Sequence, residues 1–267
     1  MPLVPDLPVA RAFVAAHPPP GAILHVGLVG AHAYGFPSPD SDLDLKGMHI
    51  APTRSLLGLS RPPETHDVLK IWRDVEHDLT THEVGRALEL LLRGNGNVLE
   101  RLMTPLQLHE TADLLALREL AQGSLSKRLA AHYRGYFRGM CREHVRAPTA
   151  KKLLYAFRVA LTGLHLLQTQ ELVTDLRITA PTYGFDVAEL IELKRNAHEK
   201  SGLPPELDAE HRQRWPELEA RLDRALERTE LPDAPGNVPA MHDWLIARRL
   251  DALPEGSPPQ INRTSPG

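Results

Sequence analysis

The chain has 267 residues, of which 42% are apolar and 24% are charged, and its formal net charge is −3 at pH 7. This composition is typical of a globular protein and excludes a fibrous or disordered chain. No apolar run approaches the roughly eighteen residues of a membrane-spanning helix, and the first residues lack the basic-then-apolar order of a secretion signal. The sequence predicts a cytoplasmic protein with two domains of ordinary size.

The first part of the chain has strand patterns. Residues 22–30 (AILHVGLVG) and 43–52 (LDLKGMHIAP) are β-branched, apolar runs joined by a glycine-rich turn. Two further strands are expected at 67–73 and 75–81. Four strands within the first 110 residues predict a small α/β domain.

Helical spacing follows. Residues 83–93 form an amphipathic pattern that GNGN at 94–97 should end, and Asn97 is expected to cap the next helix, with Glu100 at the capping-box offset. From residue 111 onward every periodic segment has the 3.6-residue repeat of a helix. We therefore expect an α/β domain at 1–110, a helical domain at 111–250 and a flexible, Pro- and Gly-rich tail at 251–267.

Charge is distributed unevenly along the helical part. Between residues 127 and 158 there are nine Lys and Arg residues and a single acid, whereas acids outnumber Lys and Arg in residues 186–233. The basic stretch is suited to contacts with phosphates, but it is equally well explained as a set of solvated helix faces. The sequence leaves both interpretations open.

The chemistry of the first turn is more specific. Asp42 and Asp44 are two apart in a strand, so their carboxylates share one face and form an oxygen-rich site for a hard divalent cation such as Mg²⁺. The turn from Gly30 to Gly35 lets backbone N–H groups approach an anion closely. Together they suit a nucleoside triphosphate whose α-phosphorus is attacked, and a two-metal reaction calls for a third carboxylate downstream.

These residues carry a resemblance. Gly30-Ala31-x-x-x-Gly35 followed by Asp40-Ser41-Asp42-x-Asp44-x-x-Gly47 resembles the signature of the DNA polymerase beta-like nucleotidyltransferase superfamily. Tyr34-Gly35, the segment 95–100 (NGNVLE) and the later Lys151-Lys152-x-x-Tyr155-Ala156-x-Arg158 are similar to one branch, the predicted nucleotidyltransferases associated with bacterial RNA repair. The matches are spread over most of the chain.

The resemblance implies an α+β fold, a small mixed β-sheet with flanking helices followed by an all-helical domain that closes over the nucleotide. It implies transfer of a nucleoside monophosphate from a triphosphate to a hydroxyl acceptor, with loss of pyrophosphate and with Mg²⁺ or Mn²⁺ as cofactor. Asp42 and Asp44 match the two metal-binding catalytic acids, and Asp78 is the best match for the third, with Glu76 in reserve. The acceptor stays open between an RNA 3′ end, DNA, a protein and a small molecule.

The expected nucleotide-binding residues come from the turn and from one later helix: Gly30, Ala31, His32, Tyr34, Gly35, Ser41, Lys152 and Arg158. Tyr34 either stacks near the nucleotide or packs in the core, and the Lys152–Arg158 flank faces the triphosphate, an RNA backbone or solvent. Ala31 replaces the family's serine, so a hydroxyl contact to the triphosphate is missing. This departure keeps a second hypothesis open, a catalytically weak regulator that binds nucleotide or RNA.

Overall fold

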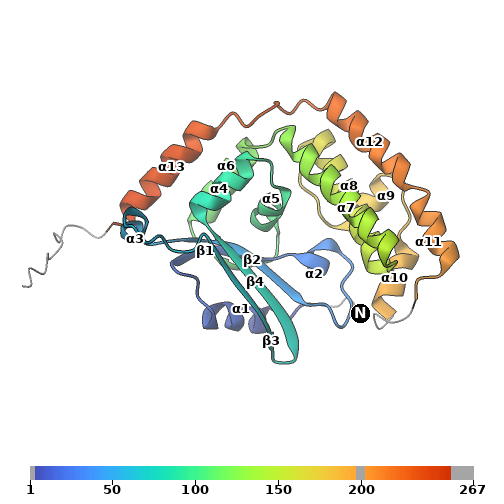
Figure 1. The fold of residues 1–267 in the computed structure, drawn as a ribbon, viewed down its shortest axis with the longest axis horizontal. Helices are drawn as coiled ribbons and strands as arrows, with labels where there is room; N and C mark the ends of the chain where they lie inside the picture. Colours follow the sequence, from blue (N-terminus) through green and yellow to red (C-terminus); the bar gives the residue numbers. More distant parts are fainter. Residues whose placement is uncertain (1–3, 197–201, 254–267) are drawn as a thin grey trace, which may run out of the picture.

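The computed structural model describes residues 4–196 and 202–253. Its centre is a five-stranded sheet in the order β3-β4-β2-β1-β5 (Figure 1). The strands are β1 (Ala22–Leu28), β2 (Leu43–Ile50), β3 (Thr65–Trp72), β4 (Val75–Glu83) and β5 (Gln107–Glu110). The four predicted strands are confirmed, whereas β5 has only four residues and too short a pattern to identify from the sequence.

The sheet is mixed, as the resemblance implies. β2 pairs parallel with β4, and every other neighbouring pair is antiparallel. Residues Arg73 and Asp74, both at positive φ, close the tight hairpin between β3 and β4. The parallel pair places Asp44 directly opposite Asp78, so two predicted catalytic acids lie side by side on adjacent strands.

Helices cover both faces of the sheet. The helices in the part of the chain that forms the sheet are α1 (Leu7–Ala16), α2 (Gly30–Tyr34), α3 (Thr53–Leu57), α4 (Val84–Leu92) and α5 (Gly96–Met103). α1 packs on one face, over Leu43, Leu45 and Leu79, while α4 and α5 contact the strands from the other side. The alternation of Asp42 and Asp44 with two buried leucines therefore directs the acids away from α1.

Two details near α5 correct the sequence analysis. The N-cap is Asn95, not Asn97, because the Asn95 side chain accepts hydrogen bonds from the N–H groups of Asn97 and Val98. Glu100 is not part of a capping box: it is buried and makes contacts with other helices. Gly94 at φ +78 ends the preceding segment, as the GNGN pattern predicts.

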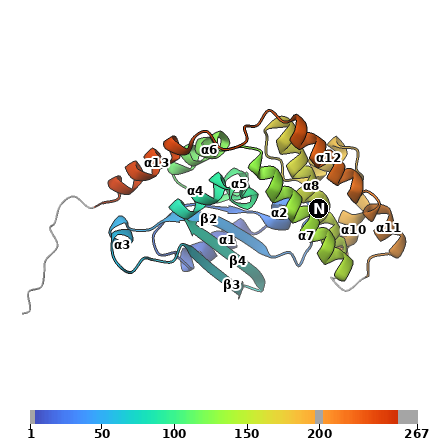
Figure 2. The ribbon, with the colours of Figure 1, turned by 45° about the horizontal axis from the view of Figure 1, so that its top comes forward.

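The rest of the described chain is helical. Its helices are α6 (Asp113–Gly123), α7 (Arg128–Arg146), α8 (Ala150–Thr169), α9 (Leu176–Thr182), α10 (Ala188–Asn196), α11 (Pro205–Arg212), α12 (Trp215–Arg228) and α13 (Val238–Asp251). α7 and α8 are the longest and pack against each other, and both views place α2 between the sheet and this pair (Figures 1 and 2). No helix among the described residues is long and apolar enough to cross a membrane.

The basic stretch of α7 has internal partners that the sequence could not assign. Arg134 pairs with Asp223 and Arg138 with Glu219, both acids of α12. Lys127 likewise pairs with Asp233 at 2.8 Å. Three of the nine cationic side chains between residues 127 and 158 are therefore paired with the acidic segment that follows, because the fold packs the two segments together.

Three histidines inside the fold make its stability decrease at acidic pH. Burial lowers the pKa of His25 to about 3 and the pKa values of His49 and His82 to about 4, so all three are neutral in the native state at pH 5 while the unfolded chain protonates them. The unfolded state then binds more protons, and stability falls as pH drops below about 6.5. His25 alone contributes a loss of about 2 kcal/mol at pH 5.

Asp44 acts in the opposite direction, because burial and then the nearby Asp42 charge raise its pKa to about 6. Protonation of Asp44 adds roughly 1 kcal/mol to the free energy of unfolding between pH 7 and pH 5, which is less than the three histidines together remove. We expect urea unfolding to show a net loss of stability at pH 5 relative to pH 7. A more stable protein at pH 5 would contradict this balance.

Candidate active site

The glycine turn that the sequence singled out lies directly against one of the two acids. Gly30 has φ +65 and opens the short helix α2, and a Cβ at this position would lie 1.8 Å from Asp44 Oδ2. Only glycine allows both the left-handed backbone and this approach. The turn and Asp44 are thus held together as one unit, with the Val29 N–H donating to the Asp44 carbonyl at 2.9 Å.

Gly30→Ala tests this contact. We expect a loss of stability of about 2 kcal/mol, from the strained backbone and the clash with the Asp44 carboxylate, together with a loss of activity. Gly135→Ala on α7 is the matched control, since nothing lies within 4 Å of its added Cβ, and it should stabilise the helix by ~0.5–1 kcal/mol. Equal stability changes in the two variants, measured by urea unfolding, would show that Gly30 is not constrained.

The two acids interact electrostatically. Burial raises the pKa of Asp44 to about 6, and the Asp42 and Asp78 charges add to the rise while Lys46 and Lys151 oppose it. Asp42 lines a cleft in front of the strand. A site that concentrates like charges in this way is suited to a divalent cation, which would relieve the repulsion.

The acid predicted to be the third, Asp78, has an ion-pair partner. Asp78 lies beside Asp44 in the sheet, and its carboxylate forms an ion pair with Lys46 Nζ at 2.7 Å. Glu76 shares the Asp78 face two residues earlier, and it lines the cleft. Lys46 was not singled out from the sequence, although its position two residues after Asp44 places it on the same strand face.

A divalent cation at this site would have few protein ligands. Among residues 4–196 and 202–253, no group of three or more His, Cys, Asp and Glu side chains is arranged to hold a metal ion. Mg²⁺, however, is commonly held by one or two carboxylates together with substrate phosphates and water. Asp42 and Asp44 fit that pattern, and a cation held by them would take its remaining ligands from substrate phosphates and water.

The cleft has a volume of about 830 Å³, within the range of small-molecule sites. Ala31, Ser41 and Asp42 line it from the sheet side, and Lys151 and Lys152 of α8 line it from the helical side. It therefore combines carboxylates on one wall with ammonium groups on the other, an arrangement suited to a metal-bound polyphosphate.

Further polar groups fix the geometry of this cleft. Lys194 of α10 donates to Ser38 Oγ at 2.9 Å and to Ser41 Oγ at 3.4 Å. Lys152 donates to the carbonyls of Glu143 and Ala147, so its ammonium group is anchored at the end of α7. Lys194 lies more than 150 residues from the turn, and no local pattern could have identified it from the sequence.

His32 is half-buried, and burial followed by the charge of Lys194 lowers its pKa, so it is neutral at pH 7. A neutral imidazole offers a phosphate one N–H donor and no positive charge. Its place on α2, next to the cleft-lining Ala31, keeps it close to the expected phosphate position.

Tyr34, Gly35 and Arg158 lie inside the protein. Tyr34 is buried, which favours the packing alternative, and its hydroxyl donates to Glu100 Oε2 at 2.9 Å. Arg158 is fully buried and binds Glu100 Oε1 at 2.7 Å, with its guanidinium 4.0 Å from the centre of the Tyr34 ring. A Cβ on Gly35 would lie 2.1 Å from Asp175 Oδ1, so this glycine allows the helical part to pack against α2.

These contacts form a buried network between the two parts of the chain. Glu100 on α5 accepts hydrogen bonds from Tyr34 on α2, Tyr133 on α7 and Arg158 on α8. The network places α2, and with it Ala31, at a fixed position relative to α7 and α8. The residue pattern around Glu100 predicts only the end of one helix and the start of the next, because long-range pairing has no periodic signal in the sequence.

The chain matches a known protein family over most of its length. A model of the RNA repair pathway DNA polymerase beta family matches residues 10–247. The chain belongs to this family. It is accordingly a polymerase beta-like nucleotidyltransferase, of a kind that generally uses divalent metals.

Two further similarities were found. Over 222 residues, 80% of the chain and 89% of the other protein, it is 25% identical to an uncharacterized protein, MJ0002, of Methanocaldococcus jannaschii. The crystal structure of a nucleotidyltransferase-like protein from Exiguobacterium sibiricum matches 92% of this chain and 80% of that one, with 14% identity and a TM-score of 0.32.

Proposed function

We propose that this family member transfers a nucleoside monophosphate from a nucleoside triphosphate to a hydroxyl acceptor, an RNA 3′ end, with release of pyrophosphate. One observation supports this most directly: Asp42, beside Asp44, and the lysines Lys151 and Lys152 border opposite sides of a single cleft of about 830 Å³. The description of the family as an RNA repair pathway family supports RNA as the acceptor.

In this proposal Asp42 and Asp44 hold Mg²⁺ or Mn²⁺, which when bound supplies charge neutralisation at the triphosphate. The N–H groups of Gly30 and Ala31, the Ser41 hydroxyl, His32 and Lys152 bind phosphate oxygens from around the cleft. Such positioning and electrostatic contacts supply most of the rate in phosphoryl chemistry. Tyr34, Gly35 and Arg158 act from the interior by holding α2 in place.

Asp78 is proposed to orient or deprotonate the incoming hydroxyl. Its carboxylate lies 2.7 Å from Lys46 Nζ, a contact that holds it in place beside Asp44. Glu76 is the alternative, since it lines the cleft on the same strand face. Asp78→Asn and Glu76→Gln separate them, because only loss of the true base lowers kcat strongly while nucleotide binding is kept.

Incubation of the protein with each α-³²P-labelled NTP, Mg²⁺ or Mn²⁺, and short RNA and DNA strands tests the proposal. Label is expected on RNA with the wild type and not with Asp42→Ala/Asp44→Ala. Label on DNA, on a protein or on a small molecule would reassign the acceptor. Metal-dependent nucleotide binding without any transfer would instead favour the second candidate, a regulator that binds nucleotide.

That second candidate is motivated by Ala31, which lines the cleft where the family has a serine. Ala31→Ser adds one hydroxyl at this wall, and one phosphate contact corresponds to a rise in kcat/KM of about fivefold to tenfold. Steady-state kinetics with the preferred NTP measure it. A variant that gains transfer from an inactive parent would establish the regulator for the natural chain.

A further inference from the structure

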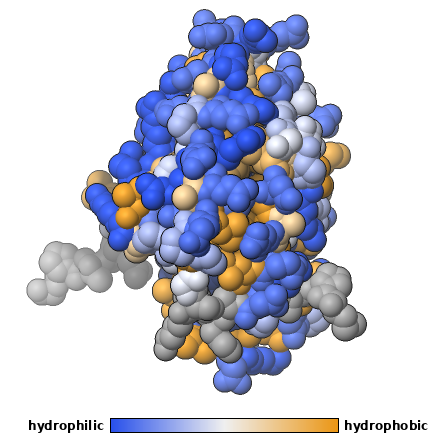
Figure 3. Space-filling model, turned by 90° about the vertical axis from the view of Figure 1, so that its right-hand side faces the viewer, coloured by the Kyte–Doolittle hydropathy of each residue, from blue (hydrophilic) through white to orange (hydrophobic). Residues whose placement is uncertain are grey.

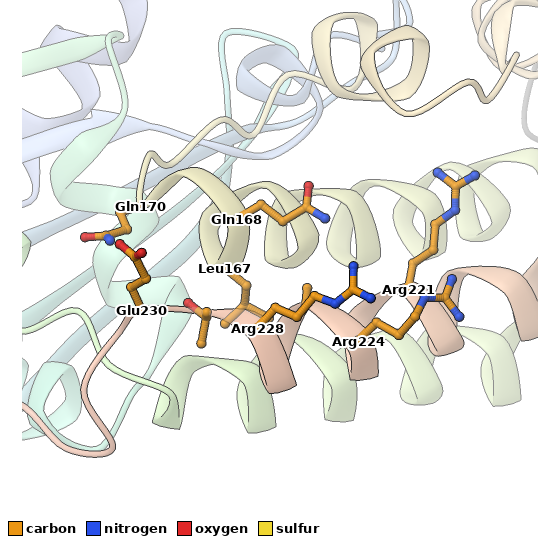
Figure 4. Close-up of a pocket in the computed structure, with 9 residues that line it drawn as sticks. Leu167, Gln168, Gln170, Arg221, Arg224, Arg228 and Glu230 are labelled. Atoms are coloured by element: carbon orange, nitrogen blue, oxygen red, sulfur yellow. The ribbon is translucent and has the colours of Figure 1, made fainter.

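A second cavity, of about 530 Å³, lies between α8 and α12 (Figure 4). α12 contributes Arg221, Arg224 and Arg228, whose spacing of three and four residues places them along one flank of the helix. The amides of Gln168 and Gln170, at the end of α8, line the other side. The cavity is thus rich in N–H donors, and we refer to it as the arginine pocket.

The positive charge of the arginine pocket is mostly unneutralised. Arg221 has a partner: its guanidinium binds Glu217 at 2.6 Å and donates to the Tyr183 carbonyl at 2.9 Å. Arg224 and Arg228 are exposed and form no hydrogen bond or ion pair with any residue that the structure describes. The acid among the lining residues, Glu230, lies at the end of the pocket near Gln170, away from the guanidinium groups in Figure 4.

This contrasts with the arginines of α7. Arg134 and Arg138 also project from a helix of the same bundle, yet both pair with acids of α12. α12 therefore directs Glu219 and Asp223 to α7 and presents Arg224 and Arg228 on another flank. Two unpaired guanidinium groups beside a fixed third one are a suitable receptor for phosphate, which an arginine binds through two parallel N–H groups.

The surroundings favour a polymer over an enclosed ligand. Both guanidinium groups are exposed, and the upper part of the face that carries α12 is mostly hydrophilic (Figure 3). A protein partner would need an apolar centre to its interface, and the apolar lining residues here are only Leu167 and Ala225, both buried. An RNA backbone needs only phosphate contacts and a wet, polar surface.

We propose that the arginine pocket binds backbone phosphates of the RNA acceptor while its 3′ end lies in the catalytic cleft, an inference that rests on the proposed function. α8 joins the two sites, because Tyr155 lines the cleft and Leu167 lines the arginine pocket. Twelve residues of helix separate them, roughly 18 Å along the axis. An A-form RNA duplex, which rises less per base pair than B-DNA, covers this length with about six base pairs.

Equilibrium binding of a fluorescent RNA hairpin with a stem of about eight base pairs, measured at several salt concentrations, tests the inference. Arg224→Ala/Arg228→Ala should bind roughly tenfold more weakly at low salt, and the slope of log K against log salt should fall by about 1.8 as two phosphate contacts are lost. Arg54→Ala/Arg61→Ala is the matched control, since both arginines are exposed and distant in sequence, and the same net charge is removed. This control should stay close to the wild type.

A dinucleotide should bind both double variants equally, because it is too short to reach from the cleft to the arginine pocket. Equal hairpin affinity for Arg224→Ala/Arg228→Ala and the wild type, or an equal loss in the control, overturns the inference. The inference is also overturned if Arg224→Ala/Arg228→Ala weakens the binding of inorganic phosphate, ATP or a polyglutamate peptide but leaves the affinity for RNA unchanged.

The Asp44→Asn chain separates this inference from the proposed function, since binding is measured there without transfer. If the wild type binds no RNA at all, the RNA acceptor of the proposed function is wrong and the inference falls with it. If the wild type binds RNA and transfers nucleotide but the arginines make no difference, only the inference is overturned.

Discussion

Asp44→Asn is expected to reduce nucleotidyl transfer by roughly 10³-fold, because it removes a carboxylate proposed to hold the cation that stabilises transition-state charge. The same change should not destabilise the fold. A rise of the Asp44 pKa from its ordinary 3.8 to about 6 means that the ionised group costs about 3 kcal/mol at pH 7 in the metal-free protein. Single-turnover kinetics and urea unfolding measure the two effects.

Metal binding supplies the control for this prediction. Mg²⁺ with a non-hydrolysable NTP should raise the Tm of the wild type and leave that of Asp44→Asn nearly unchanged, because binding to the native state stabilises it by mass action. Asp243→Asn, which removes an exposed acid of α13 that does not line the cleft, should keep the metal response. Full activity in Asp44→Asn would contradict the assignment of this residue to the metal.

Arg158→Met is expected to lower the free energy of unfolding by about 3–5 kcal/mol. Arg158 and Glu100 form a fully buried ion pair at 2.7 Å, and removing the guanidinium leaves the Glu100 carboxylate buried with only two tyrosine donors. Because Tyr34 belongs to the same network, α2 should lose its fixed position and transfer should fall as well. Urea unfolding gives the stability, and steady-state kinetics give the activity.

The double variant Glu100→Gln/Arg158→Met provides the control, because it removes both charges together and should recover part of the lost stability. Arg138→Ala removes an exposed pair with Glu219 and should cost less than about 1 kcal/mol. A loss in Arg158→Met no larger than in Arg138→Ala would show that the buried pair contributes little to the fold.

The order of elements could be predicted from the sequence because it depends on local patterns. Period-two alternation around Asp42 and Asp44 predicted a strand with both acids on one face, and β2 has its leucines buried on the opposite face. β5 was not predicted because its four residues contain too little alternation. The N-cap of α5 was predicted two residues too late because Asn95 and Asn97 have the same capping chemistry.

Only the part of the candidate site that lies in the glycine turn and the strand after it could be predicted from the sequence. Gly30, Asp42 and Asp44 lie within fifteen residues, so a motif contains them. Lys194 reaches Ser38 and Ser41 across more than 150 residues, and no spacing rule relates such positions. Arg158 was expected to contact the nucleotide or solvent as part of a helix flank, whereas the fold buries it against Glu100.

The sequence by itself therefore determined the strand and helix types, the α+β class, the shared face of Asp42 and Asp44, and the family resemblance, because each depends on residues close together in the chain. Only the tertiary structure decided the partners of charged groups: Lys46 pairs with Asp78, and Glu100 with Arg158. Two acids of α12 pair with α7, while Arg224 and Arg228 have no partner among the residues that the structure describes. The reason is that charge pairing depends on which distant surfaces pack together, and packing is a property of the whole chain.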